Sequence, residues 1–241
     1  MGAASMTTPN FPSIDFSFAL PAALIVIDLQ PCGVDPRFGL AKALETGRPG
    51  FTRHLVERMR HSVVPAVNRL LAAFHAADQP VYLTAFASPA GDGSDVRTAS
   101  IRYRNAQRLA QTGSSVILPR SDPATDIIAD IDVLSGDTVL TKTSMDSFAS
   151  TNLAGELARH AIATVVIAGV YSDACVESTG RNAAELGYPV FVAEDACAAW
   201  DPAFHAASMA SLGRYFARIE ASATIADLVD RAVDARGAVR P

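Results

Sequence analysis

Three polar side chains stand where apolar runs of the sequence end, and their types suit nucleophilic chemistry. Asp28 ends one run, Lys142 follows a second, and Cys175 comes shortly after a third. A thiolate attacks carbonyl carbons, a nearby ammonium stabilises it, and a carboxylate can take its proton and pass it to a leaving amine. Each residue also has a plain structural interpretation, as a turn cap, a solvated cation and a packing cysteine respectively.

The residues around Cys175 favour the chemical interpretation. In GVYSDAC, residues 169–175, a strand turns abruptly into a helix, for which Ser172 or Asp173 can serve as N-cap. The thiol would then lie in the first helical turn, where the helix dipole favours a thiolate over a thiol of ordinary pKa, about 8.5. The free amides of that turn can also stabilise a developing oxyanion.

Short, almost continuously apolar runs alternate with helical spacing, which is typical of βαβ units and a parallel sheet covered on both faces. Ligands of such sheets bind beyond the carboxyl ends of the strands, where the three polar residues stand. The predicted strands are Ala22–Ile27, Val81–Phe86, Thr138–Leu140, Thr164–Val170 and Val190–Val192, with a weaker one at Arg218–Ala221. The predicted helices are Val63–Phe74, Val176–Leu186, Ala203–Phe216 and Ile225–Val233.

At 241 residues, one α/β domain accounts for the chain. We expect a flexible lead-in over residues 1–18 and a single domain over 19–241. Residues 31–60 form an irregular insertion rich in Gly, Pro and Arg, interpreted as a lid, an oligomer contact or a plain surface insertion. Asp92–Arg104 is a second irregular segment.

Composition narrows the partners of the protein to small molecules. A net charge of -5 offers no footprint for nucleic acid or an anionic membrane surface, and no apolar run approaches the roughly 20 residues of a membrane span. Three scattered cysteines predict no disulfide framework, so we expect a reducing, cytoplasmic location. No G-x-G-x-x-G or Walker loop follows the first strand, which disfavours a nucleotide-binding enzyme.

Three motifs resemble those of the isochorismatase-like cysteine hydrolases, which include N-carbamoylsarcosine amidases and ureidoacrylate and biuret hydrolases. AALIVIDLQ (22–30) is similar to the first strand of that family with its catalytic aspartate at Asp28. TKTSMDSFASTNL (141–153) is similar to the lysine segment, and VIAGVYSDACV (166–176) resembles the nucleophile segment, which matches the catalytic lysine to Lys142 and the cysteine to Cys175. Each motif is weak alone, but their order is specific, and residues 31–60 match poorly.

The resemblance implies a three-layer α/β sandwich, isochorismatase-like and Rossmann-like, with a six-stranded, mostly parallel sheet and helices on both faces. It also implies a catalytic triad, a cis peptide between Val170 and Tyr171, and an oxyanion hole from the amides of Tyr171 and Cys175. The implied activity is hydrolysis of a C–N bond in a small amide, carbamoyl or ureido compound through a thioester, without a cofactor, releasing ammonia or an amine.

Departures from the family patterns narrow the substrate. None of the five histidines (His54, His61, His75, His160 and His205) forms the Asp-x-His-x-x-His pattern with which nicotinamidases of the family bind a metal, so we expect no metal. Isochorismatases that cleave a vinyl ether lack the cysteine, so the presence of Cys175 argues against that branch of the family. Candidate residues for holding the substrate, including a carboxylate on it, are Cys32, Arg37, Arg102, Arg104, Phe148, Tyr171 and Trp200.

Two further interpretations stay open. The chain could be a non-catalytic or differently specific member of the family, of nicotinamidase or isochorismatase type, or a binding protein on the same fold. We also expect a homo-oligomer, a dimer or tetramer, because of the alanine-rich helices and the family resemblance.

Overall fold

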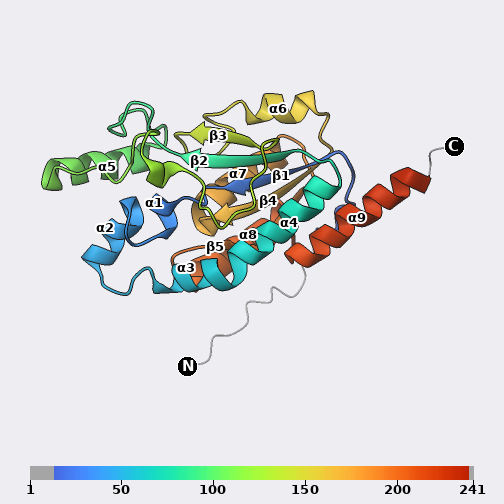
Figure 1. Ribbon diagram of the computed structural model, residues 1–241, viewed down its shortest axis with the longest axis horizontal. Coiled ribbons are helices and arrows are strands. Elements are labelled where there is room, and N and C mark those ends of the chain that lie inside the picture. The colour runs from blue at the N-terminus through green and yellow to red at the C-terminus, as the bar shows by residue number, and fades with distance from the viewer. Residues whose placement is uncertain (1–13, 239–241) are drawn as a thin grey trace.

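A six-stranded sheet lies at the centre of the computed structural model, which describes residues 14–238 (Figure 1). The strand order is β3-β2-β1-β4-β5-β6, and every neighbouring pair is parallel. The strands are β1 (Ala22–Ile27), β2 (Val81–Phe86), β3 (Thr138–Lys142), β4 (Thr164–Val170), β5 (Val190–Ala198) and β6 (Arg218–Glu220). The predicted fold class is confirmed.

Helices cover both faces of the sheet. The α-helices are α1 (Pro31–Val34), α2 (Gly39–Gly47), α3 (Arg53–Arg58), α4 (Val64–Ala76), α5 (Ala99–Thr112), α6 (Leu153–Arg159), α7 (Glu177–Glu185), α8 (Pro202–Tyr215) and α9 (Ser222–Ala238). Three short elements join them, the π-helical turns η1 (Met59–Val63) and η3 (Ser172–Val176) and the 3-10 turn η2 (Pro123–Thr125).

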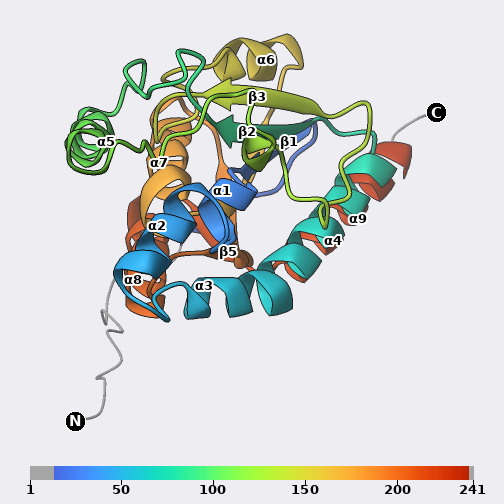
Figure 2. The same ribbon diagram turned by 60° about the vertical axis from the view of Figure 1, so that its left-hand side comes forward.

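Two apolar cores explain why the central strands are apolar on both faces. Every residue of β1 and β4 is buried. On one face Leu24 packs in a cluster with α4 and α9, which lie side by side in Figures 1 and 2. On the other face Ile25 packs in a cluster with α6, α7 and α8. The three layers hold the carboxyl ends of the strands in fixed positions.

The segment 31–60 is largely helical, so its prediction as irregular was wrong. It contains α1, α2 and α3, none longer than nine residues. Helices this short, interrupted by Gly and Pro, carry too few apolar repeats to show in a sequence window. The end of the second segment, Asp92–Arg104, was also misjudged, because α5 begins at Ala99. In Figure 1, α1, α2 and α5 lie on the side toward which β2 and β3 point.

Other boundaries differ in ways that matter for the site. β3 extends to Lys142, so this lysine is the last residue of the strand and does not follow it. β5 runs on to Ala198 through a register irregularity opposite Ile167 and Gly169. Most of the predicted lead-in lies outside the described residues; of its described part, Phe16 and Phe18 pack against the core. Within residues 14–238, no helix combines the length and the apolar character that a membrane crossing requires.

Candidate active site

The carboxyl ends of β1, β3 and β4 bring Asp28, Lys142 and Cys175 together. Nζ of Lys142 lies 2.8 Å from Oδ2 of Asp28, and Cys175 lies close enough to both for each to influence its pKa. Because β3 is two strands away from β1, the lysine side chain must reach past the end of β2, where Nζ lies 5.0 Å from the centre of the Phe86 ring. The side chain of Lys142 has no exposed surface.

Asp28 is held by its backbone and by β2. Its φ of 53° is in the left-handed region, which aspartate tolerates better than most residues. Its N–H donates to the carbonyl of Thr84 at 3.1 Å, and its Oδ1 accepts a hydrogen bond from Thr84 Oγ1 at 2.7 Å. Both carboxylate oxygens therefore have a partner, and the rotamer of the side chain is fixed.

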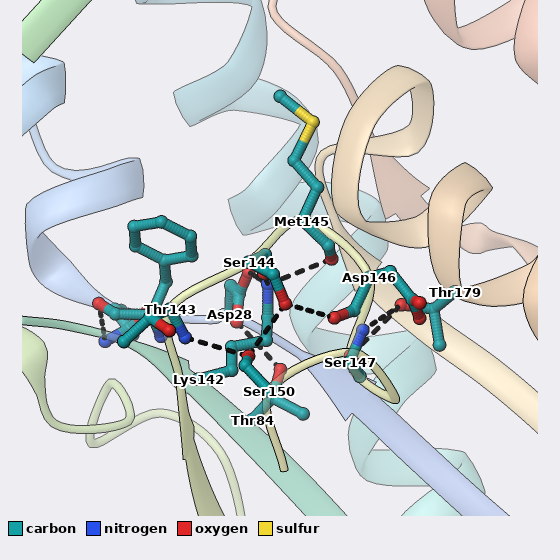
Figure 3. A network of polar contacts seen from close by, with 12 residues as sticks. Asp28, Thr84, Lys142, Thr143, Ser144, Met145, Asp146, Ser147, Ser150 and Thr179 are labelled. Atoms are coloured by element: carbon teal, nitrogen blue, oxygen red, sulfur yellow. Dashed lines mark hydrogen bonds and ion pairs between the residues drawn. The ribbon is translucent and has the colours of Figure 1, made fainter. Parts of the chain in front are cut away.

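Lys142 has three acceptors for its three protons, as Figure 3 shows. Besides Asp28, Nζ donates to the carbonyls of Ser144 at 2.8 Å and Met145 at 3.2 Å. Burial by itself lowers the pKa of Lys142, but the charge of Asp28, with the interactions of Lys142 with Asp28 and Cys175, outweighs it and the net direction is upward. The lysine is thus a fixed positive charge.

Hydrogen bonds tie the loop after Lys142 to the helix that follows Cys175. Ser147 N and Oγ contact Thr179 Oγ1 of α7 at 3.1 and 3.0 Å (Figure 3). Asn182 Nδ2 donates to Asp146 Oδ2 at 2.6 Å. The cation and the nucleophile are therefore anchored to the same helix.

The nucleophile turn, residues 171–176, begins at a cis peptide between Val170 and Tyr171, as predicted. The Tyr171 carbonyl accepts from the amides of Ala174 and Val176 at 3.0 and 3.2 Å, which gives the turn its π-helical form. Among residues 14–238, no backbone or side-chain acceptor binds the Tyr171 N–H. The expected N-cap by Ser172 or Asp173 was wrong, because no side chain caps this turn.

The resting state of Cys175 also differs from the expectation of a thiolate. Burial raises the pKa of the thiol to about 12; the charge of Lys142 lowers it and that of Asp28 raises it. Desolvation outweighs the effect of the lysine. The thiol therefore starts neutral, with the Asp28 carboxylate beside it as a base.

A cavity of about 540 Å³ opens over Cys175 and Asp28. Of the predicted substrate-binding residues, Cys32, Arg104, Tyr171 and Trp200 line it. Lining residues that the sequence did not indicate include Phe86, Asn105, Arg108, Met145 and Asp173. Arg108 lies one helical turn after Arg104, a spacing visible in the sequence that becomes informative only once α5 is known.

Three predicted binding residues lie outside the cavity lining. Arg37 forms a surface ion pair with Asp35 and is 77% exposed. Arg102 donates from Nη1 to the carbonyl of Val96 at 2.6 Å. Phe148 packs against the core on the α6, α7 and α8 face. Arg37 is thus held by its ion pair at the surface and Arg102 by its bond to Val96, and neither side chain lines the cavity.

The segment 31–60 supplies one wall of the cavity through Cys32, Gly33, Leu40, Ala43 and Leu44. Tyr171 joins this wall to the nucleophile turn, because its hydroxyl donates to the carbonyl of Gly33 at 2.6 Å. Its ring also packs on Trp200, with centroids 4.9 Å apart. Burial raises the pKa of the Cys32 and Cys197 thiols to about 12.

Within residues 14–238, no three His, Cys, Asp or Glu side chains come together in a way that could hold a metal ion.

Comparisons with known proteins identify the family of the chain. The isochorismatase domain model matches residues 22–224. The isochorismatase family protein YecD of Escherichia coli is 32% identical over 184 residues, 75% of this chain and 81% of that protein. A streptothricin hydrolase of Streptomyces noursei is 40% identical over 63 residues, 26% of this chain and 23% of that protein.

Solved structures with the same fold include two hydrolases. A cysteine hydrolase from Pseudomonas syringae superposes with a TM-score of 0.73 at 21% identity, covering 92% of this chain and 98% of that one. An N-carbamoylsarcosine amidase from Thermoplasma acidophilum superposes with a TM-score of 0.58 at 24% identity, covering 83% and 96%. The match over residues 22–224, together with the similarity to YecD, shows that this chain belongs to the isochorismatase family, whose members are hydrolases.

Proposed function

We propose that the protein is a cysteine-dependent amidohydrolase that cleaves a non-peptide C–N bond of a small amide, carbamoyl or ureido compound. The observation that carries this proposal is that Cys175 and Asp28 line one cavity and that Asp28 forms an ion pair with the buried Lys142 beside them. Two similar proteins, an N-carbamoylsarcosine amidase and a streptothricin hydrolase, support the reaction class by their names.

In the first half of the reaction, Asp28 takes the thiol proton while the sulfur of Cys175 attacks the carbonyl carbon. The tetrahedral intermediate collapses, the C–N bond breaks, and Asp28 returns the proton to the departing nitrogen. The products of this half are ammonia or an amine and a thioester on Cys175.

Water completes the cycle. The water oxygen attacks the thioester carbon while Asp28 takes a proton from that water. Asp28 gives the same proton to the sulfur when the C–S bond breaks. Lys142 donates no proton in this scheme, and its Nζ is held in place by Asp28 and by the carbonyls of Ser144 and Met145. It stabilises the carboxylate and the transient thiolate by its charge.

The amides of Tyr171 and Cys175 are the proposed oxyanion hole. The Tyr171 N–H, for which residues 14–238 offer no acceptor, lies at the start of the turn that carries the nucleophile. A preorganised amide of this kind stabilises the charge that develops on the carbonyl oxygen in the transition state.

The cavity suits a substrate with an apolar body and an anionic group. Most of its other lining side chains are apolar, and α5 contributes the cations Arg104 and Arg108. Nε of Arg108 is buried and has no hydrogen-bond partner among the described residues, which is costly unless a ligand supplies an acceptor. We assign this end of the cavity to a carboxylate of the substrate.

Ammonia release tests the proposal. The purified protein and its Cys175→Ala and Cys175→Ser variants are assayed on N-carbamoyl amino acids, ureidoacrylate, biuret, simple amides and nicotinamide. Release from one class by the wild type, absent in both variants with their thermal unfolding unchanged, supports a cysteine amidohydrolase. Equal release by wild type and variants would overturn the role of Cys175 as nucleophile. Release from none of the compounds would overturn the amidohydrolase in favour of a binding protein on this fold.

A further inference from the structure

We propose that Arg58 and His205 are positioning residues that hold the nucleophile turn, 171–176, through Ser172. They lie outside the cavity lining and do not contact the reacting atoms. The expected kinetic effect rests on the proposed function. A second measurement, the reactivity of the Cys175 thiol, needs no substrate and tests the positioning role by itself.

Arg58 is anchored on the irregular part of β5. Its Nε donates to the carbonyl of Cys197 at 2.8 Å, and its Nη2 donates to that of Glu194 at 2.9 Å. These carbonyls belong to the stretch of β5 whose pairing with β4 shifts register. One turn further along the helix, Ser62 Oγ donates to the carbonyl of Asp195 at 2.7 Å. The guanidinium therefore has a fixed position and orientation.

From this position Arg58 dictates the tautomer of His205. Nη2 lies 2.9 Å from Nε2 of His205, and because a guanidinium can only donate, Nε2 must be the acceptor. The proton of the neutral ring then resides on Nδ1, which lies 2.7 Å from Ser172 Oγ and donates to it. Burial and the neighbouring charges of Arg58 and His54 lower the pKa of His205 to about 4, so the ring is neutral at neutral pH.

A second bond from α8 holds the same residue. Ser208, one turn after His205, donates from Oγ to the carbonyl of Ser172 at 2.6 Å. Ser172 is completely buried and lies between Tyr171, which opens the turn, and Cys175, which carries the thiol. Its side chain and its carbonyl are thus both bound by one helix.

The consequence is a chain of contacts from β5, through Arg58 and His205, to Ser172, the second residue of the nucleophile turn. Loss of the bond between Nδ1 and Ser172 would free one side of the turn, so the sulfur and the two amides would lose their common alignment. A misplacement of about 1 Å costs on the order of 100-fold in rate. The helix α3, within residues 31–60, therefore contributes to catalysis without entering the cavity.

Two isosteric variants separate positioning from general stability. In His205→Asn the side-chain amide nitrogen takes the place of Nδ1 and can still donate to Ser172. In His205→Gln the amide oxygen takes the place of Nε2 and can still accept from Arg58, but the bond to Ser172 is lost. His160→Asn, at an exposed histidine after α6, is the matched control.

Measurements are kcat and KM on the substrate identified by ammonia release, and the rate of Cys175 alkylation by iodoacetamide, resolved from Cys32 and Cys197 by peptide mass spectrometry. We expect His205→Gln and Arg58→Ala to lower kcat by about 10- to 100-fold with KM changed less than about threefold. Both variants should also change the alkylation rate, while His205→Asn and His160→Asn stay near wild type.

Equal effects of His205→Asn and His205→Gln on kcat would overturn the proposal, because they would trace to loss of the ring and not to the bond with Ser172. An alkylation rate unchanged in His205→Gln would overturn it as well. If no substrate is hydrolysed by the wild type, the alkylation rates still decide the positioning role, so failure of the proposed function remains distinct.

Discussion

Lys142 Nζ and Asp28 Oδ2 lie 2.8 Å apart; Asp28 lines the cavity, and the lysine side chain behind it has no exposed surface. The two residues therefore form a buried ion pair in which each charge neutralises the other. The two charges also act on the neighbouring Cys175 thiol, whose pKa Lys142 lowers and Asp28 raises.

Removal of one member of this pair should cost more than removal of both. Lys142→Met leaves a buried carboxylate without its cation, and we expect a loss of about 3–5 kcal/mol in the free energy of unfolding. The double variant Asp28→Asn with Lys142→Met should be clearly more stable than that single variant. Urea unfolding of the four proteins measures the coupling; simple additivity of the two single effects contradicts a coupled pair.

The two partners should move the reactivity of Cys175 in opposite directions. Because the Asp28 carboxylate raises the pKa of the thiol and Lys142 lowers it, Asp28→Asn should speed alkylation of Cys175 and Lys142→Met should slow it. In the wild type the alkylation rate should climb with pH without a plateau up to pH 10, since the pKa is about 12. A plateau near pH 8 or 9 would mean that the thiol is not desolvated.

Arg108 should discriminate anionic from neutral substrates. Loss of its guanidinium in Arg108→Ala removes a charged hydrogen bond, which is worth about 1.5–3 kcal/mol, so KM for a carboxylate-bearing substrate should rise roughly 10- to 150-fold. The KM of an uncharged amide should stay unchanged. Arg102→Ala, on the same helix but outside the cavity lining, is the control. A similar rise in KM for both substrates would argue against a carboxylate at this end.

Gly169 should tolerate no side chain. A Cβ at this position would lie 2.1 Å from the carbonyl oxygen of Ile27 and 2.5 Å from its nitrogen, and its φ of +113° is unfavourable for other residues. Gly169→Ala should therefore unfold the protein or lower its melting temperature sharply. Gly47→Ala, where nothing lies within 4 Å, should leave the melting temperature unchanged or raise it. Comparable melting temperatures for the two variants would contradict the close approach of β1 and β4.

His205 should make the protein less stable in acid. Its folded pKa of about 4 lies below the ordinary value of 6.5, so between these values the unfolded chain binds a proton that the folded protein does not. The contribution of His205 to the free energy of unfolding is complete above pH 6.5 and falls as the pH decreases toward 4. His205→Asn should flatten the unfolding free energy over this window relative to wild type, as measured by urea titration. A slope equal to that of wild type would mean that the ring is not desolvated.

Much of the site could be predicted because strand ends are visible in a sequence. The apolar runs before Asp28 and Cys175 correspond to β1 and β4, and a polar residue at the carboxyl end of a parallel strand lies at the crevice by topology alone. The thiolate was not predicted correctly, because desolvation depends on what covers Cys175. The helices within 31–60 were missed since each is too short to show periodicity.

The sequence by itself determined the parallel sheet, its order of strands along the chain and the three residues at the strand ends, because these follow from local hydrophobic patterns. Only the tertiary structure decided that Arg104 and Arg108 line the cavity while Arg37 and Arg102 do not, and that Arg58 reaches Ser172 through His205. Contacts between residues more than a hundred positions apart depend on how the layers pack, and no local pattern encodes them.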